Sequence, residues 1–246
     1  MKVSALMLGR AGSTGFPGKN TLEVLGKPLM AYPILEARKS AYVEDLYIST
    51  DCPKISDIGS ALGASIIERP PHLATATALG EDAYAHGWRE ICERNPSVAP
   101  ESHILVLLFC NAVTVTSDLI DAGVEMLKAR PELDSAVSVS KYNMWSPLRA
   151  RKLDSDGLLK PFVPFEVFGD PKTLNCDRDS QGDVWFADMG VSVIRGKCLD
   201  NLDTGLLPQK WMGKNIAPIF SEAGFDLDYP WQLPQAEWWL RHRGWE

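Results

Sequence analysis

Short apolar runs alternate with stretches of helical spacing between residues 3 and 139. The apolar runs, whose length is typical of strands buried on both faces, span residues 3–8, 46–49, 65–67, 104–109 and 136–139. Apolar residues recur at helical spacing in residues 30–37, 55–62, 84–92 and 120–127. A strand, a helix and a second parallel strand form a right-handed crossover, so this rhythm predicts βαβ units around a mostly parallel sheet.

Two residues are suited to the start of predicted helices. Pro28 fits the first turn of the helix around Met30, where a backbone N–H is not needed. Ser117 fits the cap of the helix around Ile120. Later in the chain, the patterns predict strands at residues 190–194 and 216–220 and a closing helix at residues 233–240.

The strand and helix rhythm breaks in residues 141–184. This segment is rich in proline, aspartate and aromatic residues, and its prolines prevent a long helix. Two interpretations stay open: an antiparallel flap inserted for dimerisation or acceptor binding, or an irregular surface loop. We therefore expect one α/β domain over residues 1–246, with a mostly parallel mixed sheet and an inserted flap at 141–184.

Composition excludes several classes of protein. The 246 residues are 45% hydrophobic, enough for a sizeable core, and the net charge of −7 argues against binding to nucleic acid or an anionic membrane. No apolar run reaches 18 residues, so we expect a cytoplasmic protein without a membrane span. Five scattered cysteines and four unpaired histidines indicate neither a disulfide framework nor a zinc site.

A glycine-rich loop, residues 9–20, directly follows the first predicted strand. Ligands of open α/β sheets bind at the carboxyl ends of strands, so the loop lies where a ligand is expected. Its four glycines allow backbone N–H groups to face phosphate oxygens, and Arg10 and Lys19 supply opposite charge. The loop is typical of a triphosphate-binding site.

Neither of two common phosphate loops matches this segment. A Walker A loop requires glycine at position 13 and Ser or Thr at position 20, where this chain has Ser13 and Asn20. The dinucleotide fingerprint requires G-x-G-x-x-G, whereas the glycines here are spaced Gly9-x-x-Gly12-x-x-Gly15. The sequence thus disfavours an ATPase and a dehydrogenase.

Near the end of the chain, Asp226 and Asp228 are two residues apart. In an extended segment such residues point to the same side, so both carboxylates can share one hard cation. Magnesium prefers such oxygen ligands. A solvated Asp-x-Asp loop is the alternative interpretation of the motif taken alone.

Several motifs together resemble one enzyme family. They are Arg10-x-x-Ser13-x-Gly15-x-Pro17-x-Lys19-Asn20, Gly26-Lys27-Pro28-Leu29, Ser49-Thr50-Asp51, Glu68-Arg69-Pro70 with Leu73-Ala74, and Phe225-Asp226-Leu227-Asp228. The chain is similar to the acylneuraminate cytidylyltransferases, a family that includes CMP-legionaminate and CMP-pseudaminate synthetases and, more distantly, CMP-Kdo synthetases. The resemblance implies a three-layer α/β/α nucleotide-diphospho-sugar transferase-like fold, a homodimer, Mg²⁺, CTP as donor and a 2-keto-3-deoxy sugar acid as acceptor.

The resemblance also implies roles for individual residues. Arg10 and Lys19 would be catalytic and bind the nucleotide with Ser13, Asn20 and Arg69. Asp226 and Asp228 would hold the metal. The acceptor side would comprise Phe109, Asn111, Arg149 and Arg178. Each role has an alternative. Arg69 is otherwise an arginine at the rim, and Asn20 is otherwise a residue that caps the loop. Arg149 and Arg178 are otherwise solvated surface residues. Asp51 either borders the ligand or caps the following helix.

This chain departs from the family chiefly on the acceptor side. Phe109 replaces the usual glutamine, Val115 the usual arginine, and residues 186–189 lack the usual arginine and asparagine. Thr14 stands where the sialate enzymes usually have lysine. We therefore expect an acceptor other than N-acetylneuraminate, with Kdo or another acid as the alternative. A nucleotide-binding module that has lost catalysis is an alternative of a different class.

Overall fold

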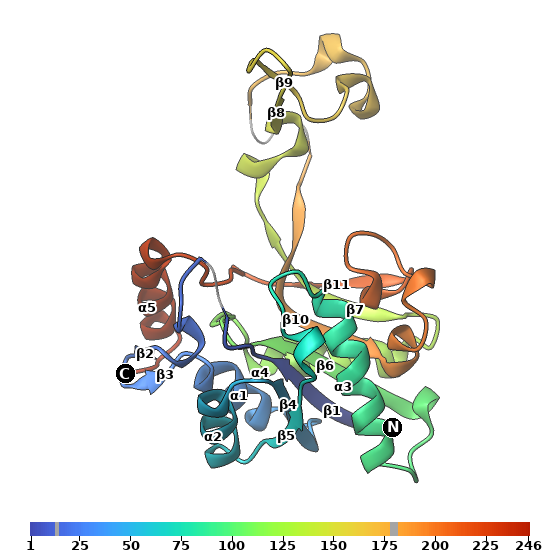
Figure 1. The fold of residues 1–246 in the computed structure, drawn as a ribbon. Helices are drawn as coiled ribbons and strands as arrows, with labels where there is room; N and C mark the ends of the chain where they lie inside the picture. Colours follow the sequence, from blue (N-terminus) through green and yellow to red (C-terminus); the bar gives the residue numbers. More distant parts are fainter. Residues whose placement is uncertain (13–14, 178–181) are drawn as a thin grey trace.

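The computed structural model describes residues 1–12, 15–177 and 182–246. Its centre is a seven-stranded sheet with the order β11-β7-β10-β6-β1-β4-β5 (Figure 1). The strands are β1 (Lys2–Leu8), β4 (Asp45–Thr50), β5 (Ser65–Glu68), β6 (His103–Phe109), β7 (Ser135–Lys141), β10 (Trp185–Arg195) and β11 (Ile216–Phe220). β10 runs antiparallel to both β6 and β7, and the other neighbours in the sheet are parallel.

Helices cover both faces of this sheet. The helices are α1 (Ala31–Lys39), α2 (Pro53–Ala61), α3 (Gly80–Arg94), α4 (Ser117–Ala129) and α5 (Leu233–His242). Because side chains alternate along a strand, Val3, Ala5 and Met7 of β1 join the core beneath α1, α2 and α4, whereas Leu6 and Leu8 join the core beneath α3. The predicted three-layer α/β/α fold with a mostly parallel mixed sheet is confirmed.

The prediction that Pro28 lies in the first turn of a helix is wrong. Pro28 belongs to a small hairpin of β2 (Glu23–Val24) and β3 (Lys27–Pro28), and α1 begins only at Ala31. The two connecting residues, Leu25 and Gly26, have φ of 48° and 72°. Two-residue hairpin loops with positive φ at both positions match the twist of paired strands, and this local preference overrides the helix signal.

The cap of α4 is also shifted by one residue from its prediction. Thr116 is the N-cap, and its hydroxyl accepts a hydrogen bond from the backbone N–H of Leu119 at 3.4 Å. Ser117 is the first helical residue, and its N–H donates to Glu36 Oε2 at 2.9 Å. Both residues can cap a helix, so the residue type alone did not decide between them.

Residues 142–177 and 182–184 belong to an arm that leaves the sheet between β7 and β10. The stem continues the antiparallel pairing as far as Lys141 and Trp185, and the outer part contains the short hairpin β8 (Arg151–Leu153) and β9 (Leu159–Pro161). Figure 1 shows the arm standing away from the body. The arm thus contains an antiparallel hairpin among irregular segments, and its role as a dimerisation or acceptor-binding flap stays a prediction. In the ranges described, no helix has both the length and the apolar content to cross a membrane.

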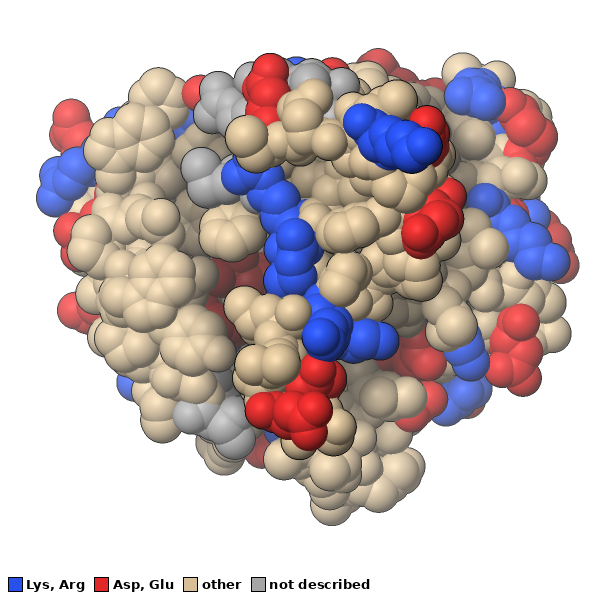
Figure 2. All heavy atoms as spheres, turned by 90° about the horizontal axis from the view of Figure 1, so that it is seen from above, with Lys and Arg blue, Asp and Glu red and all other residues tan. Residues whose placement is uncertain are grey.

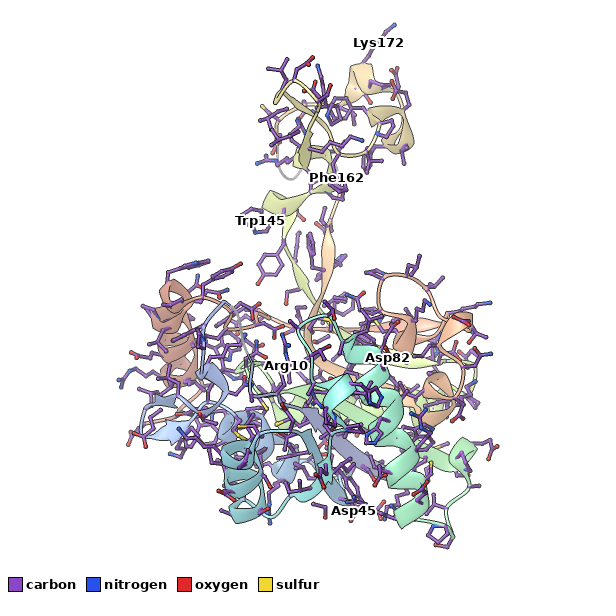
Figure 3. All side chains as sticks on the ribbon, in the orientation of Figure 1. Arg10, Asp45, Asp82, Trp145, Phe162 and Lys172 are labelled. Atoms are coloured by element: carbon purple, nitrogen blue, oxygen red, sulfur yellow. The ribbon has the colours of Figure 1, made fainter. Side chains whose placement is uncertain are left out.

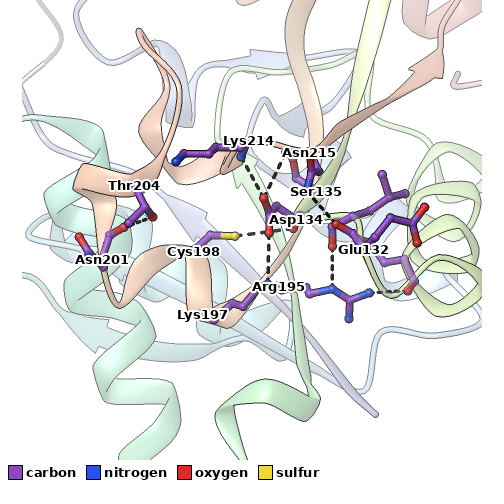
Figure 4. A network of polar contacts seen from close by, with 12 residues as sticks. Glu132, Asp134, Ser135, Arg195, Lys197, Cys198, Asn201, Thr204, Lys214 and Asn215 are labelled. Atoms are coloured by element: carbon purple, nitrogen blue, oxygen red, sulfur yellow. Dashed lines mark hydrogen bonds and ion pairs between the residues drawn. The ribbon is translucent and has the colours of Figure 1, made fainter.

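A buried arginine ties α4 to the sheet (Figure 4). Arg195, which is 6% exposed, donates from Nε to the carbonyl of Leu133 and from Nη2 to the carbonyl of Leu127, both at 2.7 Å. These carbonyls lie at or beyond the end of α4, where no further turn satisfies them. Arg195 therefore fixes the end of the helix to β10.

We expect Arg195→Met to lower the free energy of unfolding by about 3 kcal/mol, because charged hydrogen bonds are lost and buried carbonyls are left unpaired. Denaturant unfolding measures the loss. Arg130→Met is the matched control, since Arg130 pairs with the exposed Glu132 and its removal should cost less than about 1 kcal/mol. Equal losses in the two variants would contradict the assignment.

His103 at the start of β6 makes stability depend on pH. The ring is 1% exposed, its Nε2 is 2.9 Å from Ser4 Oγ, and it packs edge-on against Trp88. Burial, with the charge of Lys2, lowers the pKa of His103 to about 4. The unfolded chain, with an ordinary histidine pKa, binds this proton more readily, so stability is lost as pH falls from about 6.5 toward 4.

Between pH 7 and pH 5 we expect the wild-type chain to lose about 2 kcal/mol more of its free energy of unfolding than His103→Phe. Phenylalanine keeps the ring against Trp88 and removes the titration, so carboxylates elsewhere affect both proteins alike. Urea unfolding at both pH values measures the difference. Parallel loss in the two proteins would show that His103 does not titrate in this way.

Candidate active site

A pocket of about 450 Å³ lies at the carboxyl ends of β1, β5 and β6. Its walls come from the loop after β1, the segment after β5, the residues that follow β6 and the segment before α5. The polar, aromatic and glycine residues that line it include Arg10, Gly15, Lys19, Asn20, Arg69, Thr75, Phe109, Asn111, Asp228 and Tyr229. Seen from above, Lys and Arg side chains form a row down the middle of the face, and Asp and Glu side chains are scattered around it (Figure 2). The pocket itself has Arg10, Lys19 and Arg69 as positive charges for an anionic ligand.

The glycine-rich loop is braced against neighbouring strand ends. A side chain at Gly9 would place Cβ 2.7 Å from Cys110 Sγ, so only glycine fits there. Asp51 at the end of β4 accepts a hydrogen bond from the N–H of Ala11 at 3.1 Å. Of its two predicted roles, Asp51 does not cap α2, whose N-cap is Cys52; it holds the loop beside the pocket. Ser13 and Thr14 lie outside the described residues.

Two arginines reach the pocket from different elements. Arg10 donates from Nη1 to the carbonyl of Thr75 at 3.0 Å, joining the loop after β1 to the opposite wall. Arg69 is 5% exposed and donates from Nε to Ser49 Oγ at 3.2 Å. Its pKa is lowered by burial, yet a guanidinium keeps its charge at neutral pH. Arg69 is therefore not a solvated rim residue but a fixed cation lining the pocket.

Lys19 and Asp228 form an ion pair across the pocket. Lys19 follows Gly18, whose φ of 74° turns the chain, and Lys19 as a whole is 7% exposed. Nζ contacts Asp228 Oδ1. The neighbouring Asn20 lines the pocket, and its carbonyl accepts from the N–H of Met30 at 3.0 Å. A loop expected to meet phosphate is thus in direct contact with a predicted metal ligand.

The segment of Asp226 and Asp228 has no regular secondary structure, and Leu227 between them is fully buried. Among the described residues Asp226 Oδ1 is buried and has no hydrogen-bond partner. Burial, and then the charge of Asp228, raises the pKa of Asp226 to about 7. Two carboxylates, one with an unsatisfied oxygen and one facing the phosphate loop, fit a hard divalent cation such as Mg²⁺.

The two acceptor-side residues on β6 and beyond lie in the same pocket. Asn111 accepts the N–H of Leu227 with its carbonyl at 3.1 Å, and its Nδ2 lies 3.4 Å from Asp228 Oδ1. Phe109 is half-buried and packs edge-on against the ring of Tyr84, with the two ring centroids 5.8 Å apart. Asn111 therefore adjoins the carboxylate pair, whereas Phe109 gives the pocket an apolar wall.

Arg149 is not part of this pocket within one chain. It lies in the arm, donates to the carbonyl of Cys176 at 2.8 Å, and lines a separate cavity of about 590 Å³ together with Arg151. Figure 3 shows how far the outer arm, marked by Phe162 and Lys172, stands from Arg10. Arg178 lies outside the described residues. The acceptor roles of Arg149 and Arg178 stay predictions.

Comparison with known proteins identifies the family. The model of the cytidylyltransferase family matches residues 4–153. This chain belongs to the cytidylyltransferase family. It is therefore a nucleotidyltransferase, and the resemblance predicted from sequence motifs is confirmed.

Curated relatives of this cytidylyltransferase include enzymes of sugar-acid activation. CMP-N,N'-diacetyllegionaminic acid synthase of Legionella pneumophila is 33% identical over 172 residues, covering 68% of this chain and 71% of the relative. N-acylneuraminate cytidylyltransferase of Escherichia coli is 29% identical over 161 residues, covering 65% of this chain but only 36% of the relative. The matched region is thus about a third of the second protein.

Solved structures share the fold of this cytidylyltransferase at low identity. A CMP:2-keto-3-deoxy-manno-octonic acid synthetase complexed with CTP has a TM-score of 0.70 and 17% identity, with 99% of this chain and 100% of that chain covered. A 4-diphosphocytidyl-2C-methyl-D-erythritol synthase has a TM-score of 0.64 and 11% identity, covering 98% and 100% of the two chains. At such identities the likeness establishes the fold alone.

Sequence reasoning treated Asp188 of this cytidylyltransferase only as a departure from the family pattern. The carboxylate accepts from the hydroxyls of Ser138 and Ser140, and from the N–H of Gly190 at 3.0 Å. It sits at an irregularity of β10 and packs so closely on Gly224 that a Cβ there would overlap it. Asp188 thus supports the segment that leads to Asp226. No local pattern in the sequence marks this contact.

Proposed function

We propose that this cytidylyltransferase transfers CMP from CTP to the anomeric hydroxyl of a 2-keto-3-deoxy sugar acid and releases pyrophosphate. The anomeric oxygen forms a bond to the α-phosphorus while the bond from that phosphorus to the leaving oxygen breaks. The hydroxyl proton is lost to solvent, and the electron pair leaves with pyrophosphate. One observation carries the proposal: Arg10, Arg69 and Lys19 share a pocket with the carboxylate of Asp228.

The residues of the pocket supply what such a transfer needs. In-line transfer at phosphorus requires positioning and charge neutralisation rather than a nucleophilic side chain. Arg10, Arg69 and Lys19 would neutralise the triphosphate and the departing pyrophosphate. Asp226 and Asp228 would hold Mg²⁺, which when bound supplies Lewis-acid polarisation of the phosphoryl oxygens. Asp226 Oδ1, which is buried and has no hydrogen-bond partner within the described ranges, supports this assignment.

For the acceptor, we propose a nonulosonate of the legionaminic, pseudaminic or sialic acid class other than N-acetylneuraminate itself. The relatives named for these sugars support it. Phe109 presents an aromatic ring at the pocket wall, which favours an acceptor with a deoxy, methyl or N-acyl group over a hydroxyl-rich one. A CMP-Kdo synthetase activity is the second candidate, supported by related cytidylyltransferases named for 3-deoxy-manno-octulosonate.

We further propose a homodimer in which the arm packs against a second copy. Large apolar side chains on the arm are exposed, among them Leu153, Leu159, Phe162 and Val167. Such a patch is costly in water unless it is covered. A second copy would also give Arg149 a route to the partner's pocket. Light scattering after gel filtration measures the mass, and a monomer at micromolar concentration would contradict the proposal.

Pyrophosphate release tests the reaction. The purified protein is incubated with Mg²⁺, each of the four nucleoside triphosphates, and a panel of sialic, legionaminic, pseudaminic, Kdo and related acids. We expect release with CTP and one class of acid only. Release with Kdo alone would replace the nonulosonate proposal. CTP binding by calorimetry with no release across the whole panel would contradict the proposed reaction and favour a catalytically idle nucleotide-binding module.

A further inference from the structure

Asp228 lies on a loop, and its side chain is 53% exposed. A carboxylate expected to bind a metal must nevertheless keep a fixed place, because displacement by a fraction of an ångström weakens coordination and in-line geometry. The side chain of Asp228 is held by Lys19 and Asn111. Both of these contacts use one oxygen, Oδ1, and both hold the side chain, so the position of the backbone depends on other groups.

Gln232 makes such a contact. Its Oε1 accepts two hydrogen bonds, from the N–H of Asp228 at 2.7 Å and from the N–H of Tyr229 at 2.8 Å. The carbonyl of Asp228 faces the phosphate loop, since a Cβ at Gly15 would lie 2.8 Å from it. One side-chain oxygen therefore fixes the peptide units on either side of Asp228 Cα, next to the loop that is expected to bind triphosphate.

Gln232 itself is attached to a well-anchored element. It ends the 3₁₀ turn Pro230–Gln232, where its own N–H donates to the carbonyl of Tyr229 at 3.0 Å, and α5 follows directly at Leu233. α5 is anchored by Trp239 and Leu240, which pack with the fully buried Leu227 in one apolar cluster. The position of Gln232 is thus set by the same packing that fixes the residue before Asp228.

We propose that Gln232 is a positioning residue for cytidylyl transfer, which holds Asp228 in place through its backbone. This inference rests on the proposed metal role of Asp228. Without the Gln232 oxygen, the N–H groups of Asp228 and Tyr229 lose their protein acceptor, and the loop relaxes while the nucleotide-binding cations stay where they are. The defect should therefore affect metal binding and kcat more than CTP binding.

Gln232→Ala, Gln232→Glu and Gln235→Ala test the proposal. A carboxylate at position 232 accepts the same two hydrogen bonds, so Gln232→Glu is the conservative rescue. Gln235 is exposed on the first turn of α5 and serves as the matched control. Mn²⁺ binding is followed by electron paramagnetic resonance with CTP present and acceptor absent. CTP affinity in EDTA and thermal melting are measured on the same samples.

We expect Gln232→Ala to weaken Mn²⁺ binding about tenfold and to lower kcat about 10- to 100-fold. CTP affinity in EDTA should change less than about threefold, because the three pocket cations are untouched. Gln232→Glu should recover most of the loss, and Gln235→Ala should behave as wild type. Normal Mn²⁺ binding in Gln232→Ala, or equal impairment of Gln232→Ala and Gln232→Glu, would overturn the proposal.

Asp228→Asn separates this inference from the metal proposal. If Asp228→Asn leaves Mn²⁺ binding unchanged, the metal role of Asp228 fails, and the role of Gln232 fails with it. If Asp228→Asn weakens Mn²⁺ binding while Gln232→Ala does not, only the positioning role is overturned. Thermal melts show whether Gln232→Ala is folded, and the Gln232→Glu result decides between positioning and general packing.

Discussion

Asp226→Asn is expected to lower kcat about 1,000-fold while making the metal-free protein more stable. Removing a metal-binding carboxylate at a phosphoryl centre costs about 4 kcal/mol of transition-state stabilisation, which corresponds to that factor. The gain in stability has a different origin. Asp226 Oδ1 is buried without a partner in the described part of the chain, and the neighbouring Asp228 carries like charge.

Burying an unpaired carboxylate costs free energy that an amide of the same shape avoids. We therefore expect Asp226→Asn to raise the free energy of unfolding by about 2 kcal/mol in EDTA at pH 8. Urea unfolding and pyrophosphate release on the same preparations measure the two effects. Asp203→Asn, at a 91% exposed side chain paired with Lys210, is the control and should change neither.

The two effects of Asp226→Asn answer different questions. Loss of turnover without a gain in stability would show that Asp226 is needed but is not strained in the metal-free chain. A gain in stability with turnover retained would contradict the metal assignment. Both effects together would identify a residue kept for the reaction at the expense of the fold, as is common for charges buried in active sites.

Much of this arrangement follows from local signals in the sequence. The strand and helix rhythm predicts the layers because hydrophobic periodicity reports burial directly. The loop after β1 and the Asp226 pair stand out as candidate site residues because backbone freedom and carboxylate spacing carry chemical meaning, and their roles stay predictions. Pro28 was misplaced because a hairpin turn at Leu25 and Gly26 competes with a helix start, and residue type does not resolve that competition.

The supporting contacts of the site could not be predicted in this way. Asp188 and its two serines come from strands about 50 residues apart in the chain, and Asp51 meets Ala11 across 40 residues. Gln232 lies near Asp228 in the sequence, but a glutamine just before a helix predicts only an ordinary helix cap. The sequence does not show that one of the N–H groups bound by Gln232 belongs to a predicted metal ligand. Such roles depend on which segments the fold brings together, and periodicity does not report that.

Lys19→Met is expected to lower kcat about 100-fold or more, with a smaller rise in KM for CTP. Loss of a cation at a departing phosphate costs about 3 kcal/mol or more, and most of that cost appears in the transition state, where charge on the leaving group grows. Lys54→Met, at an exposed position on α2, is the control for loss of one positive charge and should leave both constants unchanged.

The ion pair of Lys19 with Asp228 predicts a second and opposite effect of the same substitution. In the ligand-free chain the ammonium of Lys19 contacts Asp228 Oδ1 and so competes with a divalent cation for this carboxylate. Metal without nucleotide must therefore displace Lys19, whereas a triphosphate offers the ammonium new partners and releases the carboxylate. Without CTP, we expect Lys19→Met to bind Mn²⁺ about 5- to 10-fold more tightly than the wild type. The reason is that the substitution removes a positive charge that competes with the metal for the Asp228 carboxylate.

The same variant should lose most of the increase in Mn²⁺ affinity that CTP produces in the wild type, since binding couplings between two ligands are reciprocal. Paramagnetic resonance titrations with and without a non-reactive CTP analogue give both affinities for each protein, after correction for Mn²⁺ bound to free nucleotide. Unchanged Mn²⁺ affinity in nucleotide-free Lys19→Met would show that the ion pair does not compete with metal. Tighter Mn²⁺ binding together with slower turnover would mean that one lysine both restrains the metal carboxylate before CTP arrives and neutralises the triphosphate afterwards.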